Sequence, residues 1–390
     1  MDLVFSHYGG RVVAAYFDKE NNNRLVSIKI CSEDGGSAQI GDIYIGRVKN
    51  VVKNIKAVFV EIADGQICFM QFSDEADIKK IHNEMDIVVQ VVREAVKTKQ
   101  AVVTMNINLP GRYLIKTHKR EIAVSSKIRS AARRKELSGW LEEIAAAEDC
   151  GYIIRTNAVN ASKAEIEREY KYLESLYIDI MRRAEYSVTH ALLYKTSFAE
   201  NEIRDCYDER IDRIVTDDSE IYEKIGGYID YMCPHLKERL SFYGDESFPL
   251  NAMYGLVSKI DKALAKKVWL DSGAYLVIEP TEACTVIDVN TGKAVKKGKD
   301  REKHFYNINC EAADEAMRQI SLRNLSGIII IDFIDMKSEE DNKRLMGFLA
   351  ELASNDPVKT TVVDMTGLGL VELTRKKVHK PLYEMMAPLS

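Results

Sequence analysis

Short strand-like runs dominate the first hundred residues of the chain. The apolar positions of "RVVAAYFDKENNNRLVSIKI" are interrupted by the turn-forming "ENNN", which predicts a hairpin within residues 1–35, a segment too short to be a domain alone. From Ile40 four strand-like runs follow at close spacing: "GDIYIGRVKNVV", "IKAVFVEIA", "QICFMQF" and "MDIVVQVVREAV". Short strands separated by turn residues in this way predict a small closed barrel.

Helical and strand-like patterns alternate in the rest of the chain. "GYIIRTNAV" is a strand candidate, and "SKAEIEREYKYLESLYIDIMRRAEY" has the spacing of a long amphipathic helix. Residues 200–270 alternate short strands with helices such as "DDSEIYEKIGGYIDYM". The last third places strands such as "CTVIDVN" and "GIIIIDFIDM" between helices, which predicts an α/β layer.

Two of these β-branched runs end on an aspartate, Asp288 in "TVIDVNTGK" and Asp332 in "GIIIIDFIDM". Either residue alone equally fits a cap on the turn or helix that follows. Two strand ends in one sheet can meet at the same edge, which is where open sheets bind ligands. Paired carboxylates repel each other unless a cation lies between them, and Mg²⁺ is typically held by one or two carboxylates. The pair therefore predicts a hard metal ion.

Asn290 lies two residues after Asp288, on the same face if the extended backbone continues. It could orient a carboxylate or a water molecule, or it could form an Asx-turn into "TGK". Lys293 and the lysines after it would supply positive charge for a phosphodiester.

The predicted barrel carries two aromatic side chains, Phe59 and Phe69, on neighbouring strands. Such residues can belong to the core. In an oligonucleotide-binding barrel they stack on bases instead, while basic residues such as Arg47, Lys49 or Lys99 attract the backbone.

Arg155 and Thr156 follow each other at the end of the strand candidate "GYIIRTNAV". An arginine and a hydroxyl side by side can bind a terminal phosphate through charge-assisted hydrogen bonds. A surface salt bridge would explain the same arginine equally well.

Length and composition indicate a multidomain globular protein. The chain has 390 residues, 46% apolar and 29% charged, and at roughly 150 residues per domain it would hold two to four domains. A net charge of −5 argues against a polycationic surface. Three local basic patches, residues 127–136, 292–304 and 374–380, fit either nucleic-acid contacts or solvated helix faces and loops.

The cysteines and the apolar runs indicate a cytoplasmic protein. The seven cysteines are scattered and contain no C-x-x-C pair, which fits reduced thiols and no zinc site. The N-terminus has no signal-peptide pattern, and no run reaches the ~18 apolar residues of a membrane span.

Several of these stretches together resemble the catalytic region of the ribonuclease E/G family. The stretches are "DIYIGRVKNVVKNIKAVFVEIADGQICFMQFSD", "LPGRYLI", "IIRTNAV", "IEPTEACTVIDVNTGK", "NCEAADEAMRQISLRNLSGIIIIDFIDM" and "LGLVELTRKK". The resemblance extends from the first residues to about Lys377, and the "IDVNTGK" and "IIIIDFIDM" blocks are its most specific parts.

The resemblance implies four structural parts. Residues 1–36 and 200–270 would form a non-catalytic ribonuclease H-like subdomain, and residues 37–105 an S1-type OB-fold RNA-binding domain. Residues 106–199 would form a 5′-sensor region, and residues 271–390 a deoxyribonuclease I-like catalytic domain.

The resemblance also implies roles for single residues, which are carried over position by position. The catalytic residues would be Asp288, Asn290 and Asp332, with Asp288 and Asp332 as the Mg²⁺ ligands. The residues that hold single-stranded RNA would be Phe59, Phe69 and Lys99. The pocket that senses a 5′-monophosphate would consist of Gly111, Ile115, Arg155 and Thr156.

The implied activity is an Mg²⁺-dependent endoribonuclease that cleaves single-stranded RNA hydrolytically to 3′-hydroxyl and 5′-phosphate ends. Its partners would be mRNA, rRNA or tRNA precursors, in RNA processing and mRNA decay. The family's C-P-x-C zinc-link motif does not follow "LTRKK" here, so any homodimer would form without a zinc link, as in a compact ribonuclease G-like form.

Two other functions fit parts of the sequence. A non-catalytic RNA-binding module would keep the barrel but would not need Asp288, Asn290 and Asp332. A metal-dependent phosphoesterase acting on DNA or a small ester would not need the aromatic barrel, which favours a polymer with unpaired bases.

Overall fold

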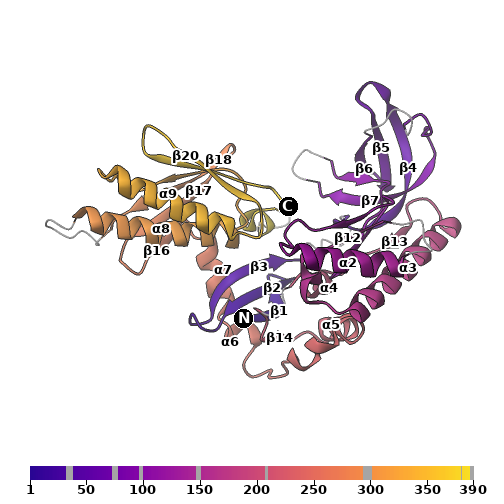
Figure 1. Cartoon of the computed structure of the whole chain (residues 1–390), viewed down its shortest axis with the longest axis horizontal. Helices are drawn as coiled ribbons and strands as arrows, with labels where there is room; N and C mark the ends of the chain where they lie inside the picture. Colours follow the sequence, from indigo (N-terminus) through magenta and orange to yellow (C-terminus); the bar gives the residue numbers. More distant parts are fainter. Residues whose placement is uncertain are drawn as a thin grey trace. The chain divides into compact units, whose positions relative to one another are not determined.

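The chain forms two compact units in the computed structural model (Figure 1). The structure describes residues 1–31, 38–72, 78–95, 100–145, 151–206, 210–292, 301–378 and 380–386. The first unit comprises Met1–Cys31, Arg213–Asp218 and Phe242–Ser390. The second unit comprises Ser32–Asp212 and Ser219–Ser241.

The N-terminal strands lie in a five-stranded sheet of order β15-β14-β1-β2-β3. Its strands are β1 Asp2–Tyr8, β2 Arg11–Asp18, β3 Arg24–Ile30, β14 Arg213–Thr216 and β15 Leu240–Phe242. The predicted hairpin is confirmed: β2 and β3 are antiparallel, and Asn22 and Asn23 in the turn both adopt positive φ angles of 53°. β1 pairs in parallel with β14, more than 200 residues away. The short N-terminal segment therefore has its core partners in a distant part of the chain.

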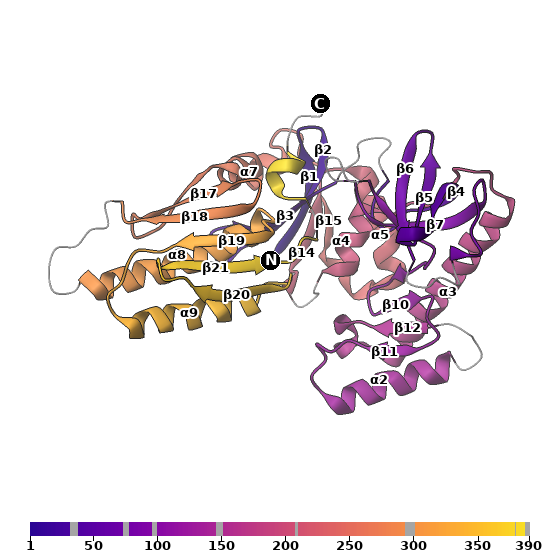
Figure 2. The ribbon, with the colours of Figure 1, turned by 90° about the horizontal axis from the view of Figure 1, so that it is seen from above.

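The first unit also contains a six-stranded sheet of order β16-β17-β18-β19-β21-β20. Its strands are β16 Lys267–Trp269, β17 Tyr275–Pro280, β18 Cys284–Asn290, β19 Gly327–Asp332, β20 Thr360–Met365 and β21 Leu370–Arg375. Helices α8 Arg301–Leu322 and α9 Glu339–Ser354 cover one face (Figure 2). Alternate side chains of the strands, such as Ile287 and Val289, are buried against these helices. The predicted α/β layer is therefore confirmed, with an open face opposite the helices, which we call the open face of the six-stranded sheet.

Two connecting helices, α6 Leu250–Met253 and α7 Leu256–Leu264, contribute apolar side chains to the core of the N-terminal sheet. Arg375, at the end of β21, is buried in an ion pair with Asp356, with an Nε–Oδ2 distance of 2.7 Å. This arginine of the basic patch at 374–380 therefore stabilises the folded interior and is not a surface charge.

The second unit contains the predicted closed barrel. Its strands are β4 Ile43–Val52, β5 Ala57–Ala63, β6 Gln66–Gln71, β7 Asp86–Arg93 and β8 Val102–Thr104, and pairing of β4 with β7 closes it. β13 Leu192–Tyr194 pairs with the β4 strand. A Cβ atom at Gly46 would lie 2.4 Å from Val60 Cγ1, so only glycine lets the barrel pack this tightly.

A smaller sheet of order β11-β12-β10-β9 adjoins helices in the second unit. The elements are β9 Leu109–Pro110, β10 Leu114–Thr117, β11 Ile122–Val124, β12 Gly151–Ile154, α2 Ala131–Ile144, α3 Lys163–Tyr186, α4 Phe198–Asp205 and α5 Ser219–Met232. The strand predicted in "GYIIRTNAV" ends at Ile154, because a 3₁₀ helix occupies Thr156–Asn160. A capping box between Ser162 and Glu165 starts α3, the predicted long amphipathic helix.

Within the described ranges, no helix is both long and apolar enough to cross a membrane. The cysteines described there are all free thiols.

Candidate functional site

Asp288 and Asp332 are direct partners across the parallel strands β18 and β19. Neighbouring strands lie about 4.8 Å apart, so the two carboxylates are adjacent on the sheet. β18 stays extended to Asn290, which places Asp288 and Asn290 on the same side, and the Asn290 amide donates a hydrogen bond to Asp288 Oδ2. The structure thus brings these three residues together on the open face of the six-stranded sheet.

The local charge is strongly negative. Burial raises the pKa of Asp332 above its ordinary value of 3.8, and the negative charges of Asp288 and Asp335 raise it further. A divalent cation fits this site because it would neutralise the repulsion, and the side chains here present oxygen ligands. No group of three or more His, Cys, Asp or Glu side chains in the described part of the chain is arranged to hold a metal. If a cation binds here, Asp288 and Asp332 are the adjacent carboxylates that could hold it. Lys293 lies outside the described residues.

A buried asparagine that the sequence did not indicate supports the end of β19. Asn309 on α8 is fully buried; its Nδ2 donates to the backbone oxygen of Ile334 at 2.8 Å, and its Oδ1 accepts from the Ile334 nitrogen at 3.0 Å. These two bonds fix the backbone two residues after Asp332. The available signal was a polar residue on the apolar face of α8, among Phe305, Ala312 and Ala313.

The two barrel phenylalanines meet as predicted from their positions. Phe59 and Phe69 are direct partners across β5 and β6, with ring centroids 5.9 Å apart in an edge-on arrangement. Both rings are half-buried, while the alternate residues Val58 and Val60 point into the barrel core. The rings therefore lie on the outer surface of the barrel.

Two of the barrel's basic residues, Arg47 and Lys49, have acidic partners. Arg47 makes two hydrogen bonds to Asp86 at 2.9 and 3.0 Å, and Lys49 pairs with Glu61 at 3.1 Å. Lys99 lies outside the described residues.

Gly111 and Arg155 also come together, in the second unit. Arg155 Nη1 donates to the backbone oxygen of Gly111 at 2.5 Å, and its Nη2 donates to Asp205 Oδ1 at 2.8 Å. Ile115 lies on β10 next to β12, the strand that leads into Arg155. Thr156 Oγ1 is hydrogen-bonded to another hydroxyl, Ser125 Oγ, at 3.1 Å.

Glu169 on α3 holds the backbone of residues 112–114, which lie within residues 111–115, here called the 111–115 segment. Its buried carboxylate accepts hydrogen bonds from the backbone nitrogens of Arg112, Tyr113 and Leu114 at 2.5, 2.7 and 2.7 Å. Burial raises the pKa of Glu169 to about 7, against the opposing effect of the three backbone bonds and Arg155. A Cβ atom at Gly111 would lie 2.6 Å from this carboxylate, so glycine is required for the close approach.

Sequence reasoning missed Glu169, although α3 carried a signal. The buried residues Ile166, Glu169, Tyr170 and Leu173 follow the spacing of one helix face. A glutamate on such a face is rarely buried without dedicated hydrogen-bond donors.

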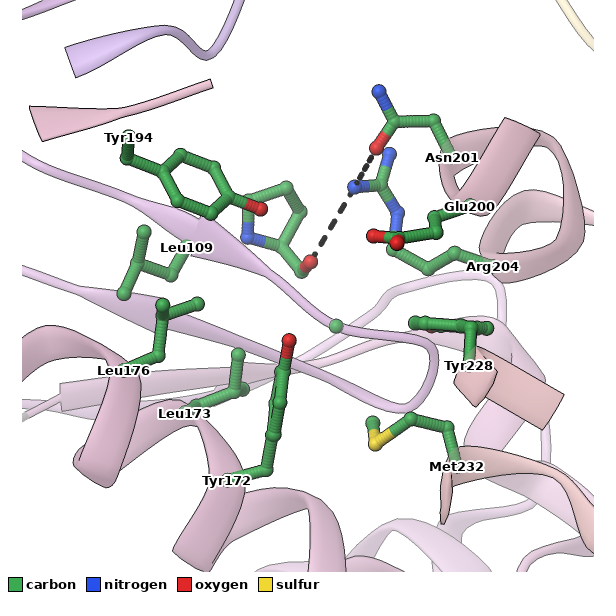
Figure 3. Close-up of a pocket in the computed structure, with 12 residues that line it drawn as sticks. Leu109, Tyr172, Leu173, Leu176, Tyr194, Glu200, Asn201, Arg204, Tyr228 and Met232 are labelled. Carbon is green, nitrogen blue, oxygen red and sulfur yellow. Dashed lines mark hydrogen bonds between the residues drawn. The ribbon is translucent and has the colours of Figure 1, made fainter. Parts of the chain in front are cut away.

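A cavity of about 20 Å³, large enough for a single water molecule, has Gly111, Tyr172, Arg204 and Tyr228 among its lining residues (Figure 3). Arg204 at its edge donates to Asn201 Oδ1 at 2.7 Å and to the backbone oxygen of Pro110 at 3.4 Å. Burial raises the pKa of Asp205, but its bonds and charge interactions with Arg204 and Arg155 outweigh this effect and lower the pKa to about 2. Arg155, which contacts Gly111 of the 111–115 segment, is thus held by a carboxylate that stays ionised.

Comparison with known proteins gives consistent matches. The chain matches the model of the ribonuclease E/G family over residues 108–378. It is 34% identical over 367 residues to ribonuclease G of Escherichia coli (strain K12), covering 89% of this chain and 74% of that relative. Ribonuclease G of Haemophilus influenzae is 33% identical over 367 residues, which also cover 89% of this chain and 74% of that relative. Ribonuclease E of Nostoc sp. is 32% identical over 389 residues, covering 96% of this chain and 55% of that relative.

Proposed function

Because the chain belongs to the ribonuclease E/G family and is an endoribonuclease of RNA processing and decay, we propose that it uses Mg²⁺ to hydrolyse single-stranded RNA. We further propose 3′-hydroxyl and 5′-phosphate products and a preference for 5′-monophosphorylated substrates. The observation that carries the proposal is the pairing of Asp288 with Asp332 on adjacent parallel strands. Binding alone would not need two adjacent carboxylates on an open face.

Each residue of the site would have a different role. Asp288 and Asp332 would hold the cation. Asn290 fixes the Asp288 carboxylate through the hydrogen bond that its side-chain amide donates. Bound there, Mg²⁺ would supply Lewis acidity and an activated water. Asn309 keeps the end of β19 in place through Ile334. The rigid sheet therefore orients the carboxylates before substrate arrives.

The test of this proposal compares three substrates of one sequence: a 5′-monophosphorylated, A/U-rich single-stranded RNA, the same strand as DNA, and duplex RNA. We expect internal cleavage of the single-stranded RNA with Mg²⁺ and none with EDTA. RNA binding without cleavage in any condition would instead identify a non-catalytic binding module. Preferred cleavage of the DNA would identify a different phosphoesterase.

The barrel would hold RNA as an S1-type domain, with Phe59 and Phe69 stacking on bases. We expect Phe59→Ala to weaken RNA binding by ~1–3 kcal/mol, because each stacked base contributes about this much. Fluorescence anisotropy with single-stranded RNA measures the effect. A lower melting temperature with unchanged affinity of the folded protein would show that the ring serves the barrel's packing.

Arg155, Thr156, Gly111 and Ile115 would form the 5′-monophosphate sensor. We expect Arg155→Ala to lower the ratio of cleavage rates for 5′-monophosphate over 5′-hydroxyl RNA by about ten-fold or more, since one charge-assisted contact contributes about 1.5–3 kcal/mol. Arg182→Ala, which removes an exposed arginine of α3 paired with Asp179, is the matched control. An unchanged ratio in Arg155→Ala would remove the sensor assignment.

The remaining assignments are also proposals. The six-stranded sheet with α8 and α9 would be the deoxyribonuclease I-like catalytic domain, and the N-terminal sheet would belong to a ribonuclease H-like subdomain. Homodimer formation and a cytoplasmic location stay predictions; native mass and cell fractionation would test them.

A further inference from the structure

An aromatic and lysine cluster lies on the same face as the carboxylate pair. Trp269 on β16 is the direct cross-strand partner of Tyr275 on β17, and Tyr275 is the partner of Asn290 on β18. The neighbouring row runs from Lys267 through Val277 to Asp288. Because direct cross-strand partners point to the same side of a sheet, the cluster shares the open face with the site. Tyr275 is one strand, about 5 Å, from Asn290, and Trp269 is two strands, about 10 Å, away.

The cluster is built around one cation between two rings. The rings of Trp269 and Tyr275 have centroids 5.1 Å apart. Lys267 Nζ lies 4.1 Å from the Trp269 centroid and 3.5 Å from the Tyr275 centroid. Trp269 is 63% exposed although it is large and apolar, so packing of the sheet does not account for it.

We propose that Trp269, Tyr275 and Lys267, which we call the Trp269 platform, bind the nucleotides that flank the scissile phosphodiester in single-stranded RNA. The two rings stack on unpaired bases, and the ammonium group contacts the RNA backbone. This inference rests on the proposed function and adds a binding subsite to it.

Geometry and charge both favour RNA as the occupant. An RNA chain that has its phosphate at Asp288 and Asp332 and extends across the sheet reaches the platform one β-strand beyond Asn290. Aromatic rings can stack on any of the bases in an RNA substrate. The lysine provides the positive charge that attracts a phosphate. In the described part of the chain, Lys267 contacts rings and makes no ion pair with a carboxylate. Its charge is therefore available to the RNA backbone.

The tryptophan content of the chain permits a direct test. The sequence has two tryptophans, and the other, Trp140, lies on α2 against Arg133. In a protein carrying Trp140→Phe and Asp288→Asn, Trp269 is the remaining tryptophan and the RNA is not cut. We expect added single-stranded RNA to quench its fluorescence in step with binding measured by anisotropy.

Affinity measurements in the Asp288→Asn background test the energetic contribution. We expect Trp269→Ala to weaken RNA binding on the order of 10- to 100-fold, with Trp269→Phe restoring most of it, because stacking needs a ring rather than an indole. Lys267→Gln should lower the salt dependence of binding, d(log K)/d(log[salt]), by about 0.7, the value for one phosphate contact on a single strand. Phe248→Ala, which removes an exposed ring of the first unit outside this sheet, should change neither quantity.

The outcomes separate this inference from the proposed function. Quenching together with the affinity loss supports the platform. RNA that binds and is cut by the wild type, without quenching and without affinity loss in Trp269→Ala, overturns the platform and leaves the endoribonuclease proposal standing. Absence of RNA binding in every variant, with native melting temperatures, overturns both.

Discussion

Asp288→Asn and Asp332→Asn should each abolish RNA cleavage and leave RNA binding nearly unchanged. The two carboxylates are direct partners on adjacent strands, and each substitution removes one negative ligand of a two-carboxylate site. We expect a loss of kcat on the order of 10³-fold or more, as for other residues that act as a unit. Single-turnover cleavage measures the rate, and anisotropy measures RNA binding.

Metal binding gives a second measurement, independent of activity. A cation that binds only the folded protein raises the melting temperature as its concentration rises, so Mg²⁺ should stabilise the wild type and not the two variants. Without metal, Asp288→Asn should melt at the same temperature as the wild type or slightly higher, because the charge of Asp288 disfavours the ionised form of Asp332. Asp364→Asn removes an exposed carboxylate of β20 and serves as the control. Loss of folding in Asp288→Asn would show that the residue is structural.

The local sequence pattern was sufficient to predict the elements whose pairing partners lie close to them in the sequence. The hairpin around "ENNN", the barrel strands and the alternation that places Asp288 and Asn290 on one face follow from two-residue periodicity. Asp288 and Asp332 are far apart in sequence, yet both belong to β-branched runs, and the connection through α8 makes their strands parallel neighbours.

Contacts between distant residues explain what the pattern could not show. Glu169 bonds backbone groups 55 to 57 positions earlier, and Asn309 bonds Ile334, 25 positions later. Backbone N–H groups have no sequence signature, so a side chain that binds them looks like any buried polar residue. The Trp269 platform was missed for a related reason. The strand β16 has only three residues, too few to show the alternation of a β-strand in the sequence. Only its register with β17 decides on which face of the sheet its side chains lie.

Glu169→Gln should destabilise the folded protein substantially. The carboxylate accepts three backbone hydrogen bonds on its two oxygens, whereas glutamine offers one oxygen and turns its amide NH₂ group toward a buried N–H. An unsatisfied buried donor costs about 1–3 kcal/mol, so we expect the free energy of unfolding to fall by about 1–3 kcal/mol in urea titrations. Glu167→Gln, on the same helix but paired with Lys171 at the surface, should change it by less than about 0.5 kcal/mol.

The same substitution should impair the proposed 5′ sensor and alter the pH dependence of stability. Residues 112–114 would lose their fixed positions, so the preference for 5′-monophosphate RNA should fall while cleavage of 5′-hydroxyl RNA in the surviving folded protein changes little. The pKa of Glu169 is raised from 4.5 to about 7, which means that the folded state binds its proton more tightly than the unfolded state does. Its contribution to stability is therefore fully present below about pH 4.5 and is lost as the pH rises through about 7. The difference in unfolding free energy between wild type and Glu169→Gln should shrink across that interval. A difference that stays constant from about pH 4.5 to about pH 8 would show that Glu169 keeps an ordinary pKa, and a preserved 5′ preference would show that the 111–115 segment is held by other contacts.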